Sequence, residues 1–148
     1  MSRRELGGKY LLDADVFIAF IRGDELSDSA EKVVEGIVEE RVRAVVSSML
    51  YDDIISGLRS KGMSLEGVRK VLVSVAAIPH ESLPVTPALS VSALQLYERY
   101  GGPRKLHYFD SYHVATSRLE DIPLITSDSY ILDHREDLGI RAEDLSKL

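Results

Sequence analysis

Apolar residues follow two alternating patterns along this chain. Short apolar stretches have the length and composition of buried strands, and between them apolar residues recur three and four positions apart, as on one face of a helix. The expected strands are Lys9–Asp13, Arg43–Ser47, Leu83–Thr86 and Ile122–Thr126, with a fifth at Ile140–Ala142. The expected helices begin near Val16, Ser27, Leu50, Ser64, Pro87 and Asp110.

This alternation predicts the class of fold. Strands that alternate with helices are joined by right-handed crossovers, which produce a parallel sheet with helices on both faces. We expect one α/β domain over residues 1–148, a three-layer α/β/α sandwich around a central parallel sheet of four to five strands. Pro84 has no backbone N–H, so its strand belongs at an edge of the sheet. Ser47 or Ser48 is expected to cap the helix that carries Leu50.

Composition and charge narrow the classes of protein. The chain has no cysteine, which excludes a disulfide framework, a thiolate zinc site and a cysteine nucleophile. Residues 1–10 carry charge without an apolar cleavage-signal stretch, and no apolar run approaches the length of a membrane span, so we expect a soluble cytoplasmic protein. The net charge of −6 argues against a protein that coats nucleic acid. It leaves room for a nuclease, whose metal ions supply local positive charge.

Four aspartates, Asp13, Asp53, Asp110 and Asp128, stand where expected strands end or expected helices begin. In a parallel sheet those positions converge on one rim, so the four carboxylates are expected to share a site. A cluster of ionised carboxylates that is shielded from water is unfavourable in free energy without a cation, because each carboxylate raises the pKa of its neighbours. Hard oxygen ligands select Mg²⁺ or Mn²⁺, and such sites commonly serve phosphodiester cleavage.

Each of these aspartates also has a simpler interpretation as a helix N-cap. Asp13 or its neighbour Asp15 suits that position after the first strand, and the same holds for Asp110 and for Asp128. One such residue is therefore weak evidence for a site. The combination on one rim is the informative observation.

The choice between Asp52 and Asp53 stays open at this point. Both flank the apolar face of their expected helix at similar angles, so the helical wheel does not distinguish them. Gly57 lies near Asp53 on the wheel and leaves space beside it, which gives Asp53 a slight preference.

One polar stripe follows the helix that is expected to begin at Asp110. Asp110, His113 and Ser117 are spaced i, i+3 and i+7, while Leu119 falls on the apolar side of the same helix. The stripe either faces water or lines a cleft. A single histidine on such a helix is more often packed and hydrogen-bonded than a metal ligand, so His113 is expected to support the site at most.

Four stretches of the chain resemble the motifs of the PIN domain family. They are Tyr10–Val16, Val46–Ile55, Phe109–Thr116 and Leu124–Asp128, in the order of the family and spanning most of the chain. Among the members of this family, the chain is most similar to the single-domain ribonuclease toxins of the VapC type.

This resemblance implies a metal-dependent endoribonuclease that hydrolyses phosphodiester bonds in RNA with Mg²⁺ or Mn²⁺ as cofactor. It assigns Asp13, Asp110 and Asp128 to metal binding, with Thr126 as a hydroxyl that helps to hold the site. It places Asp53 at the position of the second acid, which is usually glutamate in the family. The resemblance also implies a homodimer and, for a toxin, a small antitoxin protein as partner.

Some residues depart from the family pattern or lie around the expected site. Asp15 adds a carboxylate where the family commonly has a small amide or hydroxyl, and Asp52 remains the alternate second acid. Four basic residues lie on segments that approach the rim and are candidates to hold RNA phosphates, although any one of them is more often solvated surface charge. They are Arg59, Lys61, Arg104 and Lys105.

Two other functions fit parts of the sequence. A haloacid-dehalogenase-like phosphatase also has two aspartates spaced like Asp13 and Asp15 after a strand, and it uses the first as a nucleophile. It usually has glycine where this chain has Val16, and it needs a rim lysine that the sequence does not place. The second alternative is a non-catalytic PIN-like module that binds RNA or protein. The aspartate at position 53 favours it, because metal geometry is sensitive to the reach of a ligand.

Overall fold

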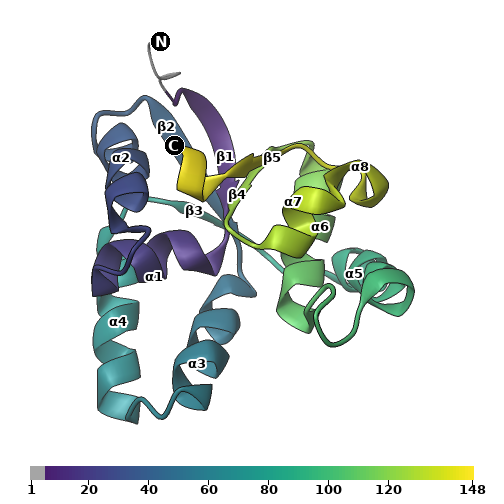
Figure 1. Ribbon diagram of the computed structural model, residues 1–148, viewed down its shortest axis with the longest axis horizontal. Helices are drawn as coiled ribbons and strands as arrows, with labels where there is room; N and C mark the ends of the chain where they lie inside the picture. The colour runs from purple at the N-terminus through teal and green to yellow at the C-terminus, as the bar shows by residue number, and fades with distance from the viewer. Residues whose placement is uncertain (1–5) are drawn as a thin grey trace.

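A sheet of five parallel strands lies at the centre of the protein (Figure 1). The structure is a computed structural model that describes residues 6–148; residues 1–5, half of the charged amino-terminal segment, lie outside the described part of the chain. In spatial order the strands are β3 (Glu81–Leu83), β2 (Val42–Ser47), β1 (Gly8–Leu12), β4 (Leu124–Thr126) and β5 (Ala142–Asp144).

The order of the strands creates a switch point between β1 and β4. From β1 the chain proceeds outward to β2 and β3, and then it returns to the other side of β1 to form β4 and β5. Crossovers on the two sides of such a point leave in opposite directions and open a crevice at the carboxyl ends of the two strands. Both strand ends carry residues of the expected site, Asp13 after β1 and Thr126 in β4.

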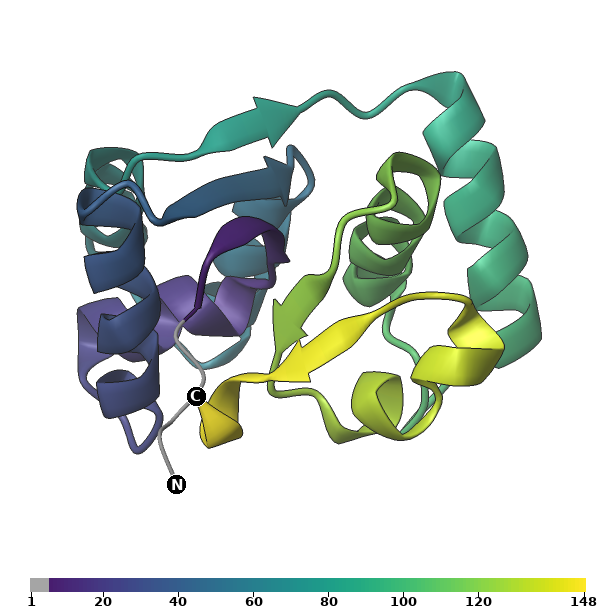
Figure 2. The same ribbon diagram turned by 90° about the horizontal axis from the view of Figure 1, so that it is seen from above.

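Helices cover both faces of the sheet (Figure 2). Helices α1 to α4 lie on one face, and α5 to α8 lie on the other, which confirms the expected three-layer α/β/α sandwich. Within residues 6–148, no helix is sufficiently long and apolar for a membrane crossing. The helices are α1 (Ala14–Arg22), α2 (Ser27–Val38), α3 (Leu50–Ser60), α4 (Leu65–Ala77), α5 (Pro87–Tyr100), α6 (Tyr108–Glu120), α7 (Ser129–Asp133) and α8 (Arg135–Leu138).

The two apolar cores meet at the central strand. Successive side chains of a strand point to opposite faces, so Tyr10 and Leu12 of β1 pack against α1 to α4, while Leu11 packs against α5 and α6. Leu11 and Leu12 are fully buried. A strand that is covered on both faces is apolar at nearly every position, which explains why β1 was visible in the sequence as a continuous apolar run.

The strand expected at Leu83–Thr86 forms earlier, as Glu81–Leu83. It lies at the edge of the sheet, as the proline predicted. The strand ends at Leu83 because Pro84 has no N–H to donate to a partner. The next N–H, of Val85, donates to Oγ of Ser48 at 3.1 Å instead of extending the pairing of the strands.

The carboxy-terminal elements also differ from the expectation. The strand expected at Ile140–Ala142 lies two residues later, at Ala142–Asp144, and β4 begins at Leu124 instead of Ile122. Helices α7 and α8 were not expected, because helices of five and four residues are too short to show a period in the sequence.

The cap expected for α3 and the start expected for α6 were wrong. Helix α3 has Met49 as its N-cap and no side-chain capping bond. Oγ of Ser47 accepts the N–H of Met49 at 3.2 Å, and Oγ of Ser48 accepts the N–H of Val85, which follows β3, at 3.1 Å. Helix α6 begins at Tyr108 instead of Asp110, because the carbonyl of His107 already accepts the N–H of Ser111 at 3.1 Å. Asp110 therefore lies in the first turn of α6 and does not cap it.

Helix α6 is buried on almost all sides. Every residue from Asp110 to Ser117 is buried, so the polar stripe lies inside the protein, and the hydroxyl of Ser117 donates to the carbonyl of Ile122 at 2.5 Å. Leu119, expected on the buried apolar side, is 58% exposed. It is the residue before the last in the helix, in the exposed end that follows the buried run Asp110–Ser117.

A compact turn leads from α5 into α6 and fixes the start of α6. Leu106 is fully buried, and a bridge pairs it with Gly101. A Cβ atom on Gly101 would lie 2.3 Å from the carbonyl oxygen of Tyr97 and 2.5 Å from its ring, so only glycine fits without a shift of the backbone.

We predict opposite effects of alanine at two glycines. Gly101→Ala should lower the free energy of unfolding by about 1–3 kcal/mol, because the added methyl overlaps the Tyr97 backbone. Gly57→Ala should raise it by about 0.4–1 kcal/mol, because a Cβ there meets nothing within 4 Å and the helix interior favours alanine. Urea unfolding measures both values. Equal changes in the two variants would contradict the packing described for the turn.

Candidate metal centre

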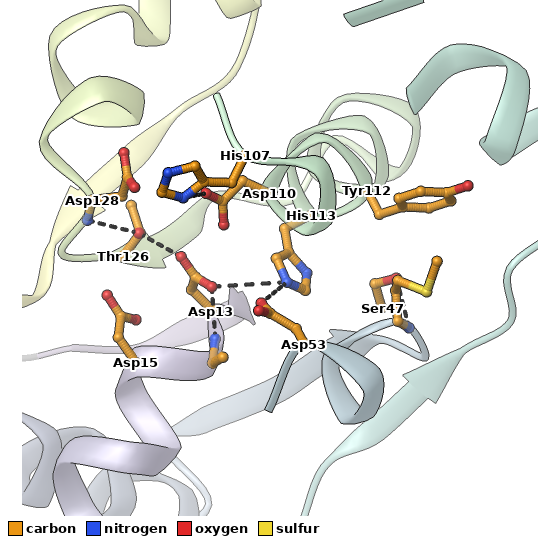
Figure 3. A network of polar contacts seen from close by, with 12 residues as sticks. Asp13, Asp15, Ser47, Asp53, His107, Asp110, Tyr112, His113, Thr126 and Asp128 are labelled. Carbon is orange, nitrogen blue, oxygen red and sulfur yellow. Dashed lines mark hydrogen bonds and ion pairs between the residues drawn. The ribbon is translucent and has the colours of Figure 1, made fainter. Parts of the chain in front are cut away.

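Asp13 is the centre of a group of polar residues at the carboxyl ends of β1 and β4 (Figure 3). It caps helix α1, with Oδ1 accepting the N–H of Ala14 at 2.7 Å, and its Oδ2 accepts the hydroxyl of Thr126 at 2.7 Å. Its side chain is 5% exposed. The interpretation of Asp13 as a cap is therefore confirmed, and the capping carboxylate also lies within reach of the other acids of the candidate site.

Asp53 and Asp110 approach Asp13 from two other elements. Asp53 lies in the first turn of α3, and Asp110 lies in the first turn of α6. One ligand atom from each of Asp13, Asp53, Asp110 and His113 lies within 4.8 Å of the others. Asp52 is exposed and takes no part in this group, so of the two neighbouring acids it is Asp53 that faces the crevice.

His113 lies between two of the acids. Its ring is fully buried, and its Nε2 is 2.9 Å from Oδ2 of Asp53 and 3.8 Å from Oδ1 of Asp13. Its Nδ1 has no hydrogen-bond partner among residues 6–148. The histidine is packed and hydrogen-bonded, as the sequence suggested, and its bond is made to a carboxylate of the group itself.

A second group shares Asp110 with the first. One ligand atom from each of His107, Asp110 and Asp128 lies within 4.8 Å of the others, and Nδ1 of His107 is 3.4 Å from Oδ2 of Asp110. Asp128 also caps α7, since its Oδ1 accepts the N–H of Ile131 at 3.0 Å. The four aspartates therefore form two overlapping groups around Asp110 rather than one cluster.

Two residues near the acids were missing from the sequence-based set. His107 stands three positions before Asp110, a helical spacing that was hidden because the start of α6 was placed too late. Ser127 donates its N–H at 2.7 Å and its hydroxyl to Oδ2 of Asp15, while Oδ1 of Asp15 is buried without a hydrogen-bond partner among the described residues. Asp15 thus lies beside the group, tied to the end of β4.

The four basic residues expected to hold phosphates are all exposed, and in residues 6–148 none of them forms an ion pair with the acids of the two groups. The guanidinium of Arg59 donates to the carbonyl of Met63 at 2.8 Å. The other three are Lys61, Arg104 and Lys105. Arg104 and Lys105 belong to the turn that leads to His107, so they lie on the segment that enters the acidic group.

Burial and mutual repulsion raise the pKa of the acids. Burial and the charge of Asp13 raise the pKa of Asp110 to about 9, and the same two causes raise the pKa of Asp15 to about 8. Burial also raises the pKa of Asp13. For His113, burial alone would lower the pKa, but the bond to Asp53 and the nearby carboxylate charges outweigh it and raise the pKa to about 9.

The buried carboxylates outnumber the one imidazole beside them, so their mutual repulsion is only partly offset. Two like charges about 4 Å apart repel each other by about 4 kcal/mol at an effective dielectric constant of 20. The donor set is mainly carboxylate oxygen, which suits Mg²⁺ or Mn²⁺, and the one imidazole nitrogen in it is occupied by Asp53. The residues therefore fit a hard divalent cation, which would restore the ionised state of the acids.

We predict that the metal-free protein loses stability as the pH rises from 5.5 to 8.5. The raised pKa values mean that the folded state binds protons at Asp13, Asp15, Asp110 and His113 more tightly than the unfolded state, so these groups stabilise the fold at low pH and lose that effect as the pH approaches their folded pKa values. The loss should exceed about 1.4 kcal/mol, the equivalent of one pKa unit. Urea unfolding in EDTA at several pH values measures it.

Two variants test the origin of that pH dependence. Asp110→Asn should flatten the profile, because it removes one buried carboxyl group and relieves its neighbours. Asp52→Asn, an exposed acid next to Asp53, should leave the profile unchanged. A wild-type profile that is flat or rises with pH would show that the acids are not as crowded as the structure places them.

Solved structures of other proteins have a similar fold. The fold is similar to VapBC2 from Rickettsia felis bound to a DNA fragment from its promoter, with a TM-score of 0.68, 16% identity, and coverage of 93% of this chain and 98% of that chain. It is also similar to a toxin–antitoxin complex from Klebsiella pneumoniae, with a TM-score of 0.63, 14% identity, and coverage of 94% and 99%. VapBC-1 from nontypeable Haemophilus influenzae matches with a TM-score of 0.61, 16% identity, and coverage of 95% and 100%.

At these identities the structural likeness establishes the fold, and the family follows from the sequence itself. Among curated protein sequences, none is similar enough to this chain to count as a relative. The family model of the PIN domain matches residues 10–136, which include the acids that follow β1 and β4 and those in α3 and α6. The chain belongs to the PIN domain family.

Proposed function

We propose that this protein is a Mg²⁺- or Mn²⁺-dependent endoribonuclease and that its whole length acts as one PIN domain. The observation that carries the proposal is the convergence of Asp13, Asp53 and Asp110, which come from three separate segments and place ligand atoms within 4.8 Å of one another. Membership of the PIN family supports the same activity. The remaining acids, Asp128 and Asp15, extend the negative surface along the end of β4.

Each side chain has a role in this proposal. A divalent cation in the site would lower the pKa of a bound water and stabilise charge on the phosphate. Asp13, Asp53 and Asp110 would supply oxygen ligands, and Thr126 would hold Asp13 through its 2.7 Å bond to Oδ2. Asp128 would serve the second group that contains Asp110. One carboxylate would accept the proton of the attacking water, and no side chain would become a covalent nucleophile.

We further propose that the protein is the toxin of a toxin–antitoxin pair in the cytoplasm. Several solved structures with this fold are toxin–antitoxin or VapBC complexes, which supports a small protein partner for this chain. A homodimer is proposed on the family resemblance. The RNA substrate would enter along the segment with Arg104 and Lys105, whose exposed side chains precede His107 and the acidic groups.

A PIN-like module that binds RNA without cutting it is the second candidate. The specific observation in its favour is the aspartate at position 53, whose carboxylate is already hydrogen-bonded to His113. The phosphatase hypothesis has lost its basis, because the family model that matches residues 10–136 is that of the PIN domain.

Cleavage of a fluorescent single-stranded RNA is the direct test. The wild-type protein should cut it in Mn²⁺ or Mg²⁺ and stop when EDTA is added, because the acids alone carry no positive charge for the phosphate. Asp53→Asn and Asp110→Asn should each reduce the rate by on the order of 10²-fold or more, as expected for loss of a group that supports charge in the transition state.

Asp52→Asn is the matched control for that experiment. It makes the same chemical change one residue from Asp53, at an exposed position outside the acidic group, and should keep the wild-type rate. Retention of RNA by a wild-type protein that does not cut would favour the binding module. If Asp52→Asn and Asp53→Asn lower the cleavage rate equally, Asp53 is not distinguished from Asp52 as the second acid of the site.

Metal linkage provides an independent prediction. Mg²⁺ or Mn²⁺ at about 100 times its Kd should raise the free energy of unfolding of the wild-type protein by about 2.7 kcal/mol, because the cation binds only the folded cluster. Asp13→Asn and Asp110→Asn should gain much less, and in EDTA they should be as stable as the wild type or more stable, since each removes a buried repulsion. Thermal melting with and without metal measures both effects. Identical shifts in wild type and variants would contradict a shared site.

A further inference from the structure

We propose that His113 is a positioning residue that holds the carboxylate of Asp53 in the metal-binding arrangement. This inference rests on the proposed metal-dependent function and concerns a contact between α6 and α3. Nε2 of His113 lies 2.9 Å from Oδ2 of Asp53, and the ring is fully buried in the middle of α6 (Figure 3). Asp53 makes no other hydrogen bond through its side chain within residues 6–148.

The other ring nitrogen indicates that His113 donates a hydrogen bond and does not bind the metal. A histidine that binds a metal through Nε2 carries its proton on Nδ1 and normally donates it to a carboxylate, a carbonyl or water. Nδ1 of His113 is buried and has no partner in the described part of the chain. A proton on Nε2, by contrast, points to Oδ2 of Asp53 at hydrogen-bond distance, so the contact that the structure shows is one that His113 donates.

Asp53 needs such a contact more than the other acids do. Both oxygens of Asp13 are held by Ala14 and Thr126, and Oδ1 of Asp128 is held by the backbone of α7. The side chain of Asp53 is 22% exposed and stands in the first turn of a helix whose N-cap makes no side-chain bond. Without His113, repulsion from Asp13 would turn this carboxylate toward solvent.

The length of the side chain makes the contact specific to this chain. Aspartate is one methylene shorter than the glutamate that the family resemblance leads one to expect, so its carboxylate reaches less far from α3. The imidazole of His113 holds Oδ2 of Asp53 and leaves Oδ1 without a hydrogen bond among residues 6–148. His113 is 3.8 Å from Oδ1 of Asp13, so the same N–H group lies between the two carboxylates and keeps them at a fixed separation.

Metal affinity of the purified full chain tests the proposal. His113→Leu removes the N–H group at similar volume and should raise the Kd for Mn²⁺, measured by titration calorimetry, about 10- to 100-fold. His113→Gln, whose amide can still donate to Asp53, should retain most of the affinity. His134→Leu is the matched control, because within residues 6–148 the ring of His134 bonds to the carbonyl of Tyr130 and stacks on its ring, away from the acids.

A double-mutant cycle separates positioning from a packing effect. In an Asp53→Ala background the contact is already absent, so His113→Leu should change the Kd by about twofold or less. Equal losses in the Asp53→Ala and wild-type backgrounds would overturn the proposal. A loss in His113→Gln as large as in His113→Leu would also overturn it, in favour of His113 as a metal ligand. If His113→Leu does not fold by circular dichroism, His113→Asn, which is too short to reach Asp53, replaces it.

The ring tautomer is a readout that needs neither RNA nor cleavage. Nitrogen NMR of the ring in the Mg²⁺-loaded protein should show a proton on Nε2 of His113, the atom that contacts Asp53; an Nε2 without a proton would overturn the proposal. The same measurement without metal tests the contact itself. If the wild-type protein binds Mn²⁺ but cuts no RNA, the proposed nuclease activity is wrong, while the Mn²⁺ affinities of the His113 variants still test the proposal about His113. A wild-type protein that binds no Mn²⁺ would overturn both.

Discussion

Repulsion between buried carboxylates is the constraint on which the organisation of this protein depends. Asp13 and Asp110 are 5% and 8% exposed, and both lie within reach of Asp53. The fold partly compensates with fixed donors, the N–H groups at the starts of α1 and α7 and the hydroxyl of Thr126. Helix N-termini favour negative charge, but each contributes only about 0.3–1 kcal/mol at exposed sites. That is less than one repulsive pair, and the raised pKa values of the acids reflect this shortfall.

The acids stay together because the strands that carry them cannot separate. Leu11 and Leu12 precede Asp13, Leu124 and Ile125 precede Thr126, and all four are fully buried between the two helical layers. Full burial of such side chains contributes roughly 1.5–3 kcal/mol each. The four together exceed the repulsion of one carboxylate pair, about 4 kcal/mol. The strands therefore hold the carboxylates in fixed positions, and the repulsion between these carboxylates is not fully compensated by the protein. Both conditions favour tight binding of a small cation.

The sequence predicts the fold better than the site, and the reasons are local. Apolar periodicity predicted the parallel sheet and its helical layers, but it placed β5 two residues too early and missed α7 and α8, which are too short to show a period. Asp13 and Asp128 were recognisable because they follow strands. Asp53 is distinguished from Asp52 by its proximity to Asp110 and His113 of α6. A helical wheel of α3 alone carries no information about the neighbouring helix. Helix α6 misled most, because it is buried on nearly every side and its polar residues face the interior of the protein.

The same burial explains why α6 carries so many polar residues without losing stability. Ser111, Thr116 and Ser117 donate their hydroxyl groups to backbone carbonyls, so their polarity is satisfied within or next to the helix. Asp110 and His113 have no such local partner and turn to the crevice instead. A buried polar group that the surrounding backbone does not satisfy costs about 1–3 kcal/mol. In α6 this cost falls on Nδ1 of His113, which has no partner among residues 6–148, while Nε2 of the same ring contacts Asp53. The residues of α6 that its own backbone does not satisfy are therefore those that reach the acidic group.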